Sequence, residues 1–174
     1  MKHHFEMLAH YNRWANRVLC EAVETLDREE FSRNVGAYFK SMCGTLNHIL
    51  IADRVWLVRF TGAQETSGPL NAIPYPDFAD LTEAREREDA RIIRYVQGLE
   101  DAQLGQAITY RTISSPTQIS QPLAPALTHF FNHQTHHRGQ AHMILSVLGK
   151  EPPPMDLIFY LRTPEGMALQ SRFN

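Results

Sequence analysis

Four long segments of this chain repeat apolar residues at spacings of three and four, and this period constrains the fold more than any other feature. Apolar residues at that spacing lie along one face of an α-helix, and that face has to be buried against another element. The segments cover residues from about 4 to 26, 37 to 60, 80 to 99 and 124 to 148. The pattern predicts an all-α protein built from four main helices.

The connections between these helices differ in character. Residues 61–78, TGAQETSGPLNAIPYPDF, concentrate glycine, proline, serine and asparagine, which predicts a long loop of the kind that often folds over a site. Residues 106–120 alternate briefly around Ile108, Tyr110 and Thr112 before the sequence SSP, so they allow a short hairpin before the last helix. Gly149 is a typical terminator for that helix, and the apolar run at 157–161 is expected to pack back on the bundle.

Length and composition exclude several classes of protein. A chain of 174 residues needs only one hydrophobic core, so we expect a single domain over residues 1–174. The formal net charge of -2 provides no basic field for phosphates, and we expect no nucleic-acid partner. No segment has the apolar length of a membrane span or the pattern of a secretory signal, which predicts a cytoplasmic protein without a membrane partner.

Charged residues dominate one stretch of the third helix, EAREREDAR at 83–91. Opposite charges three and four residues apart support each other on a helix, so we interpret the run as a solvated face. The two cysteines, Cys20 and Cys43, are too few for a disulfide scaffold. We expect both to be reduced and to pack as small apolar side chains.

Histidines are the unusual component, because five of the nine fall within residues 129–142. Each helical residue advances by about 100 degrees, so His133 and His137 lie one turn apart on the same face and can bind the same ion. His129 and His136 border this face, whereas His142 lies on the opposite side of the helix from His133. The pair predicts a metal site with two of its ligands.

A zinc-type site usually needs at least three protein ligands, and one helix is strained to provide three. His48, from the second helix, is a candidate for the third ligand, because its neighbours on the same face, Gly44, Thr45, Ala52 and Val55, are small enough to leave space around the imidazole. A hydrogen-bonded core histidine is the alternative for His48. Gln140 and His136 are candidates for hydrogen bonds to a substrate or to water, and Arg54 and Arg138 for anion contacts or surface ion pairs.

Three stretches of the sequence resemble the DinB-like family. They are YNRWAN in the first helix, LNHILIADRVWL in the second and NHQTHHRGQAHMIL in the fourth. The resemblance implies an antiparallel four-helix bundle, often a homodimer, whose metal is held by a histidine of the second helix and an HxxxH pair of the last. Those positions are His48, His133 and His137 here, with His129 and His136 as alternatives.

The resemblance also implies an activity. Members of the family transfer low-molecular-weight thiols such as bacillithiol to electrophiles or use mycothiol in an isomerisation, and others have no assigned reaction. We therefore expect a metal-dependent thiol S-transferase acting on a small-molecule substrate, or a hydrolase at the same centre. The alternative is a non-catalytic metal-binding protein of a stress response. Imidazole ligands suit several ions, of which we expect zinc first and nickel next.

Overall fold

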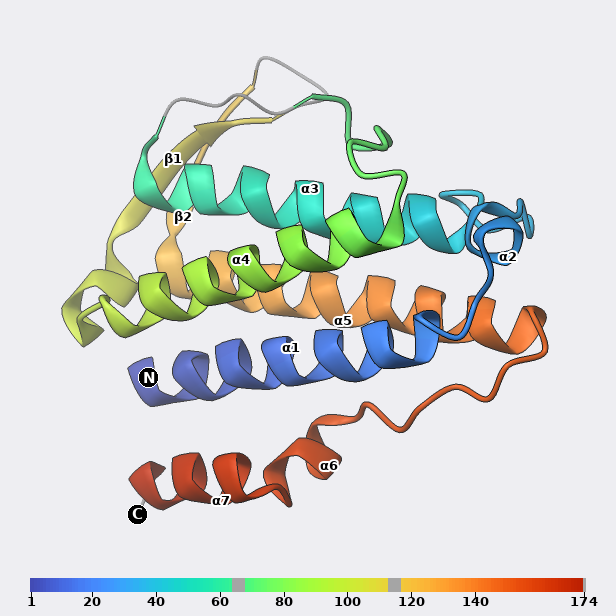
Figure 1. Cartoon of the computed structure of the whole chain (residues 1–174). Helices are drawn as coiled ribbons and strands as arrows, with labels where there is room; N and C mark the ends of the chain where they lie inside the picture. The colour runs from blue at the N-terminus through green and yellow to red at the C-terminus, as the bar shows by residue number, and fades with distance from the viewer. Residues whose placement is uncertain (64–67, 113–116, 174) are drawn as a thin grey trace.

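The computed structural model describes residues 1–63, 68–112 and 117–173 (Figure 1). Four long helices form the body, namely α1 (Lys2–Val23), α3 (Met42–Thr61), α4 (Phe78–Gln97) and α5 (Leu123–Val147). Helix α1 packs against α4 and α5, and α3 packs against the same two helices. The expected all-α four-helix bundle is therefore confirmed. Its helices end within a few residues of the predicted positions, except that α3 begins at Met42 rather than near residue 37.

The helices run in an up, down, down, up order (Figure 1). Each is antiparallel to one neighbour, α1 to α4 and α3 to α5, and parallel to the other. The reason is the long connection between α3 and α4, which returns the chain to the end of the bundle where α3 began. This arrangement places the middle of α3 opposite the middle of α5, so that side chains from two antiparallel helices can meet at one site.

Shorter elements complete the fold. A turn of helix, α2 (Arg28–Ser32), precedes α3, and a 3-10 helix, η1 (Asp101–Gly105), leads into a hairpin of β1 (Ala107–Arg111) and β2 (Gln118–Pro122). The two strands are antiparallel with Thr109 opposite Ser120, which confirms the expected hairpin. Residues 113–116 of that prediction, and residues 64–67 of the predicted long loop, lie outside the described part of the chain.

The carboxyl-terminal segment packs on the bundle, as expected from its apolar residues. It contains α6 (Leu157–Leu161), α7 (Pro164–Gln170) and the 3-10 turn η2 (Ser171–Phe173). Tyr160 is fully buried and forms a cluster with Met7, Tyr11 and Ala15 of α1. Before this segment, Gly149 follows the end of α5 with a φ of 74°, the left-handed conformation that glycine adopts without strain.

The start of α3 is fixed by its sequence. The Ser41 hydroxyl accepts a hydrogen bond from the Gly44 amide and so caps the helix. Just before it, Lys40 has a φ of 72° and forms a bridge with Ala37, so residues 37–40 make a tight turn. Because of this turn, residues 37–41 are not helical, although the apolar pattern predicts a helix from about residue 37.

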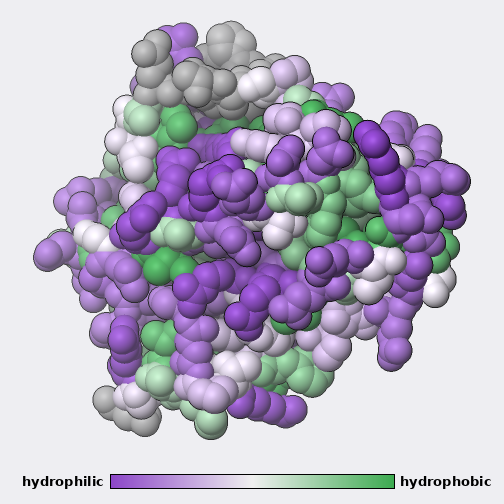
Figure 2. All heavy atoms as spheres, viewed as in Figure 1, coloured by the Kyte–Doolittle hydropathy of each residue, from purple (hydrophilic) through white to green (hydrophobic). Residues whose placement is uncertain are grey.

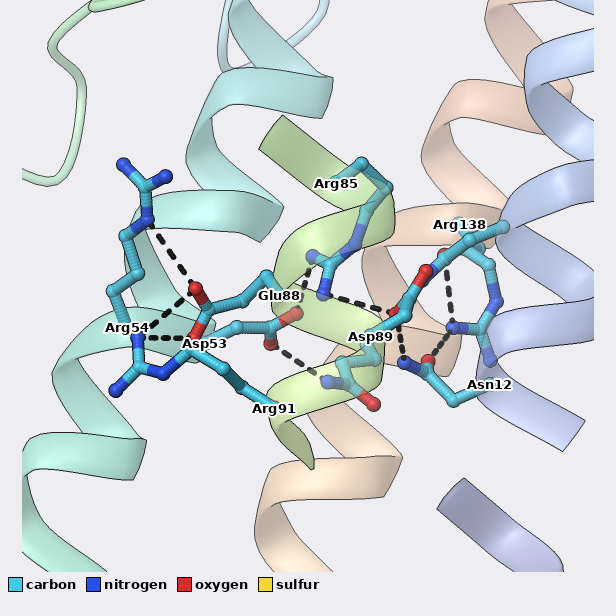
Figure 3. A network of polar contacts seen from close by, with 10 residues as sticks. Asn12, Asp53, Arg54, Arg85, Glu88, Asp89, Arg91 and Arg138 are labelled. Atoms are coloured by element: carbon cyan, nitrogen blue, oxygen red, sulfur yellow. Dashed lines mark hydrogen bonds and ion pairs between the residues drawn. The ribbon is translucent and has the colours of Figure 1, made fainter. Parts of the chain in front are cut away.

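A layer of buried polar side chains crosses the middle of the bundle between two apolar clusters (Figure 3). Asp53 of α3 accepts hydrogen bonds from Arg85 of α4 at 2.5 Å and from Gln134 of α5 at 2.7 Å. Asp89 of α4 accepts hydrogen bonds from the amides of Asn12 and Asn16 on α1. One polar network thus joins all four long helices.

Part of the charged run on α4 therefore lies inside the protein, contrary to the expected solvated face. Arg85, Glu88 and Asp89 are buried, and only the outer charges of the run, such as Glu83 and Arg87, are exposed. Arg138 is likewise buried, where it donates to Asn12, so it is not a surface ion-pair residue. Figure 2 shows that the face formed by α1 and α4 is still mostly hydrophilic, in keeping with these outer charges.

Candidate metal centre

The structure brings together the three histidines that the sequence singled out. His48 of α3 and His133 and His137 of α5 form a group whose ligand atoms all lie within 4.8 Å of one another. The Nε2 atom of His137 is 3.2 Å from that of His48 and 3.1 Å from that of His133. A tetrahedral zinc ion bonded at about 2.0–2.1 Å would hold ligand nitrogens roughly 3.3 Å apart. The three imidazoles are placed so that one ion could bind all of them.

Hydrogen bonds on the outer side of two rings determine which nitrogen faces the centre. The Nδ1–H of His48 donates to the Leu70 carbonyl at 2.9 Å. The Nδ1–H of His137 donates to the Gln140 side-chain oxygen at 2.7 Å, and the Gln140 amide in turn donates to His136 at 3.2 Å. In a neutral imidazole the proton on Nδ1 leaves Nε2 with a free lone pair. Both Nε2 atoms are thereby fixed as electron-pair donors.

Two such lone pairs facing each other at 3.2 Å repel unless a cation lies between them. A proton or a metal ion can remove this repulsion, but burial disfavours the proton. Loss of hydration lowers the pKa of His133 to about 3 and that of His137 to about 4, and it also lowers the pKa of His48. The three rings are thus neutral near pH 7, which is the form that binds metals.

The turn before α3 closes one side of the centre. The Phe39 ring stacks on the His48 ring with centroids 3.8 Å apart and meets His137 edge to face. Gly44 permits this approach, because a Cβ at that position would overlap the Phe39 carbonyl oxygen. The small residues beside His48 were expected to leave an open pocket around the imidazole. At Gly44 that space is instead filled by Phe39.

A cavity of about 730 Å³ opens beside the histidines. Its walls come from residues 38–41 and Gly44, from Leu70, Asn71 and Ile73 of the connection to α4, and from the three histidines. Within the described ranges, the ligating group contains three side chains and no fourth histidine, cysteine or carboxylate. Three protein ligands beside a cavity form the donor set of a catalytic zinc site, whereas structural sites usually have four protein ligands.

The remaining histidines of α5 have other contacts. The His129 ring packs against Trp56, with centroids 5.0 Å apart, and borders His133. His136 accepts the hydrogen bond from Gln140, so these two residues orient His137 rather than facing the cavity. The sequence makes Gln140 and His136 candidates for contacts with a substrate or water, whereas in the structure they contact each other and His137. Gln140 lies three residues after His137, and His136 directly precedes it. This spacing places both residues beside His137 on the helix and is the sequence signal for their role in orienting it.

Neither cysteine is placed to act as a nucleophile. Cys20 lines a groove of about 890 Å³ between α1 and α4, away from the histidines, and burial raises the pKa of its thiol to about 11. Cys43 is buried, and burial raises its thiol pKa as well. A thiol with a raised pKa carries little thiolate at neutral pH. Any sulfur chemistry at the histidine centre would need a thiol from outside the chain.

Comparisons with known proteins agree with this fold. The chain is 26% identical over 165 residues to Protein DinB of Bacillus subtilis strain 168, an alignment that covers 88% of this chain and 91% of the relative. Its fold is similar to the crystal structure of a DinB-like protein from Bacillus cereus ATCC 10987. That likeness has a TM-score of 0.62 at 18% identity and covers 80% of this chain and 89% of the other.

None of the helices in the described ranges has the length and apolarity needed to cross a membrane.

The sequence model of the DinB family matches residues 1–167, which is nearly the whole chain. This chain therefore belongs to the DinB family.

Proposed function

We propose that His48, His133 and His137 bind one divalent metal ion, zinc in the first place and nickel as the alternative, and that the chain is a metal-dependent enzyme. The observation that supports this most is the convergence of three imidazole nitrogens beside a cavity, with Nε2–Nε2 distances of 3.1 and 3.2 Å, two of which have their ring proton on the outer Nδ1 atom. Membership of the DinB family and the neutral state of the rings support it as well.

Three neutral ligands leave the full charge of a divalent ion in place, so such an ion would lower the pKa of a water or thiol that reaches it. The protein residues have supporting tasks. The Leu70 carbonyl and the Gln140 side chain fix the orientation of the His48 and His137 rings. Phe39 covers one side of the histidine group. Outer hydrogen bonds of this kind fix the tautomer and orientation of a ligand.

The reaction that we favour is transfer of a low-molecular-weight thiol to an electrophile. The thiol loses its proton to solvent, its sulfur forms a bond to the electrophilic carbon, and the leaving group departs with the electron pair of the broken bond. The substrate has to supply the sulfur, because Cys20 and Cys43 have raised pKa values. Hydrolysis, in which water takes the place of the thiol, would use the same three histidines.

A non-catalytic role in metal binding during stress is the alternative. A structural site would be closed by a fourth protein ligand. The cluster holds three ligating side chains in the described ranges and borders a cavity, which favours the enzyme. We also propose, from the resemblance, that the protein is a homodimer acting on a small molecule, which light scattering of the purified protein tests.

The function is tested by assaying zinc-loaded and nickel-loaded protein with small thiols and an alkylating electrophile, and separately with activated esters. Loss of thiol or ester that requires the ion and disappears in His133→Ala is expected. His142→Ala serves as the control, because His142 lies on α5 outside the ligating group. If the loaded protein binds its ion with unchanged affinity but turns over neither class, the non-catalytic alternative replaces the enzyme.

A further inference from the structure

The cavity beside the histidines has an unbalanced charge. Among the described residues that line it, Lys40 is the one formally charged side chain, and no aspartate or glutamate is present. The first turn of the 20-residue helix α3 also borders the cavity through Ser41 and Gly44, and a helix amino terminus favours negative charge. The cavity is therefore suited to an anion.

The backbone at Lys40 has an uncommon conformation. Its φ of 72° lies in the left-handed region, where a lysine is strained and a glycine would not be. Two hydrogen bonds hold the turn, from Val35 N to the Lys40 carbonyl and from Lys40 N to the Ala37 carbonyl, both at 2.8 Å. The adjacent Phe39 ring lies on the His48 ring. The turn thus fixes the Lys40 backbone next to the ligand set.

The charge of Lys40 is also not used within the protein. In the described part of the chain Lys40 forms no ion pair, and its side chain is exposed. By contrast, Arg33 pairs with Glu29 at 3.3 Å and Lys150 pairs with Glu30 at 3.1 Å. A cation that is exposed at the wall of a cavity and free of acidic neighbours is available to a ligand.

We propose that Lys40 selects anionic substrates, binding the carboxylate of a small thiol whose sulfur reaches the centre formed by His48, His133 and His137. This inference rests on the proposed function and names its substrate class. Lys40 is a specificity residue and takes no part in the bond changes. A carboxylate-bearing thiol would meet a positive charge at each end, at the ion and at the Lys40 ammonium group.

The test uses cobalt(II)-loaded full-length protein, whose absorption changes when a thiolate binds the ion. Three thiols of similar length are titrated, 3-mercaptopropionate with an anionic end, 2-mercaptoethanol with a neutral end and cysteamine with a cationic end. In Lys40→Met, the affinity for mercaptopropionate is expected to fall about tenfold, the size of one charged hydrogen bond, while that for mercaptoethanol is unchanged. Lys40→Arg is expected to restore the preference.

Arg33→Met is the matched control, because Arg33 is a nearby exposed cation that pairs with Glu29 and does not line the cavity. Thermal unfolding of each variant checks that the fold is intact. If Lys40→Met and the native protein show the same ratio of affinities, the role of Lys40 is wrong and the thiol function stands. If no thiol changes the cobalt spectrum, the proposed thiol function itself is wrong, and the role of Lys40 is wrong with it.

Discussion

The Nε2 atoms of His48 and His137 lie 3.2 Å apart although the Nδ1–H of each ring is engaged elsewhere, with the Leu70 carbonyl and the Gln140 side chain. The contact places two lone pairs together in a buried position. A cation between the rings would relieve the repulsion between these lone pairs. This pair of residues is therefore the most specific reason to expect a metal at this point of the bundle.

Gln140 is expected to strengthen metal binding without touching the ion. Its side-chain oxygen accepts the Nδ1–H of His137, and loss of such an outer partner typically weakens a metal site by about 10–100-fold. Gln140→Leu should therefore weaken zinc affinity by this factor in a chelator competition titration. His142→Gln, also on α5, should leave the affinity unchanged. Equal affinities in the Gln140 variant and the native protein would contradict the orienting role.

The metal-free protein should lose stability as the solution becomes acidic. Burial lowers the pKa of His133 from 6.5 to about 3 and that of His137 from 6.5 to about 4. Below pH 6.5 the unfolded chain therefore binds protons at these positions and the folded chain does not, so the free energy of unfolding falls with pH, until about pH 4 for His137 and about pH 3 for His133. Urea unfolding of metal-free protein across this range measures the slope.

A double variant, His133→Gln with His137→Gln, should reduce that slope, because glutamine does not titrate. The native and variant proteins are compared without metal and at the same ionic strength. A variant slope equal to the native slope would mean that other groups cause the acid sensitivity.

Asp53 should be among the most destabilising positions to change. Its carboxylate is buried and accepts hydrogen bonds from Arg85 and Gln134, so Asp53→Ala leaves the Arg85 charge inside the bundle without this partner. A buried pair that is broken completely costs about 3–5 kcal/mol, and because Asp89 stays 3.0 Å from Arg85 we expect the lower end of that range. Glu83→Ala removes an acid from the exposed pair with Arg87 and should change stability by less than about 1 kcal/mol. Chemical unfolding measures the free energy of unfolding of both variants. Equal losses would show that the buried network does not hold the helices together.

Two tyrosine hydroxyls should respond in opposite ways to removal. The Tyr11 hydroxyl donates to the Met155 carbonyl at 2.8 Å, and Tyr11→Phe should cost about 1 kcal/mol. The Tyr160 hydroxyl is buried without a hydrogen-bond partner in the described structure, so Tyr160→Phe should be neutral or stabilising. Thermal unfolding of Tyr11→Phe and Tyr160→Phe measures the change in stability of each variant. A loss for Tyr160→Phe as large as for Tyr11→Phe would show that Tyr160 has a partner.

The sequence was sufficient to predict the helices and the grouping of the three histidines. Helical period is a local property, and it located α1, α4 and α5 within a few residues. His133 and His137 are neighbours through helix geometry alone. The small neighbours of His48 made it a candidate for the third ligand, and the family resemblance favoured that role over a hydrogen-bonded core histidine. The start of α3 was misjudged, because the turn at Lys40 depends on hydrogen bonds to Val35 and Ala37 that no period reveals.

The buried charges of α4 were missed for a different reason. Arg85, Glu88 and Asp89 were assigned to a solvated face by their chemistry, yet they lie on the same helical stripe as Leu81, Ala84, Ile92 and Val96. Position on the stripe was the better guide, because the bundle provides Asp53 as a partner for Arg85, Asn12 and Asn16 for Asp89, and Arg54 for Glu88. Those partners come from other helices and cannot be seen from one segment.

The contribution of Phe39 could not be predicted either. Its ring reaches His48 because the turn before α3 folds back over the first turn of that helix, where Gly44 leaves room. A small residue beside a histidine predicts that another group approaches the imidazole closely. Which group approaches depends on the tertiary fold, which the local sequence does not reveal.

The most direct test of the metal centre is the metal content of tag-free protein, measured by elemental analysis beside His48→Ala, His133→Ala and the control His142→Ala. We expect close to one zinc or nickel ion per chain in the native protein and in the control, and its loss in the other two variants. If the native protein holds no ion and takes up neither zinc nor nickel when they are supplied, the three histidines are not a metal site and the proposed function is wrong.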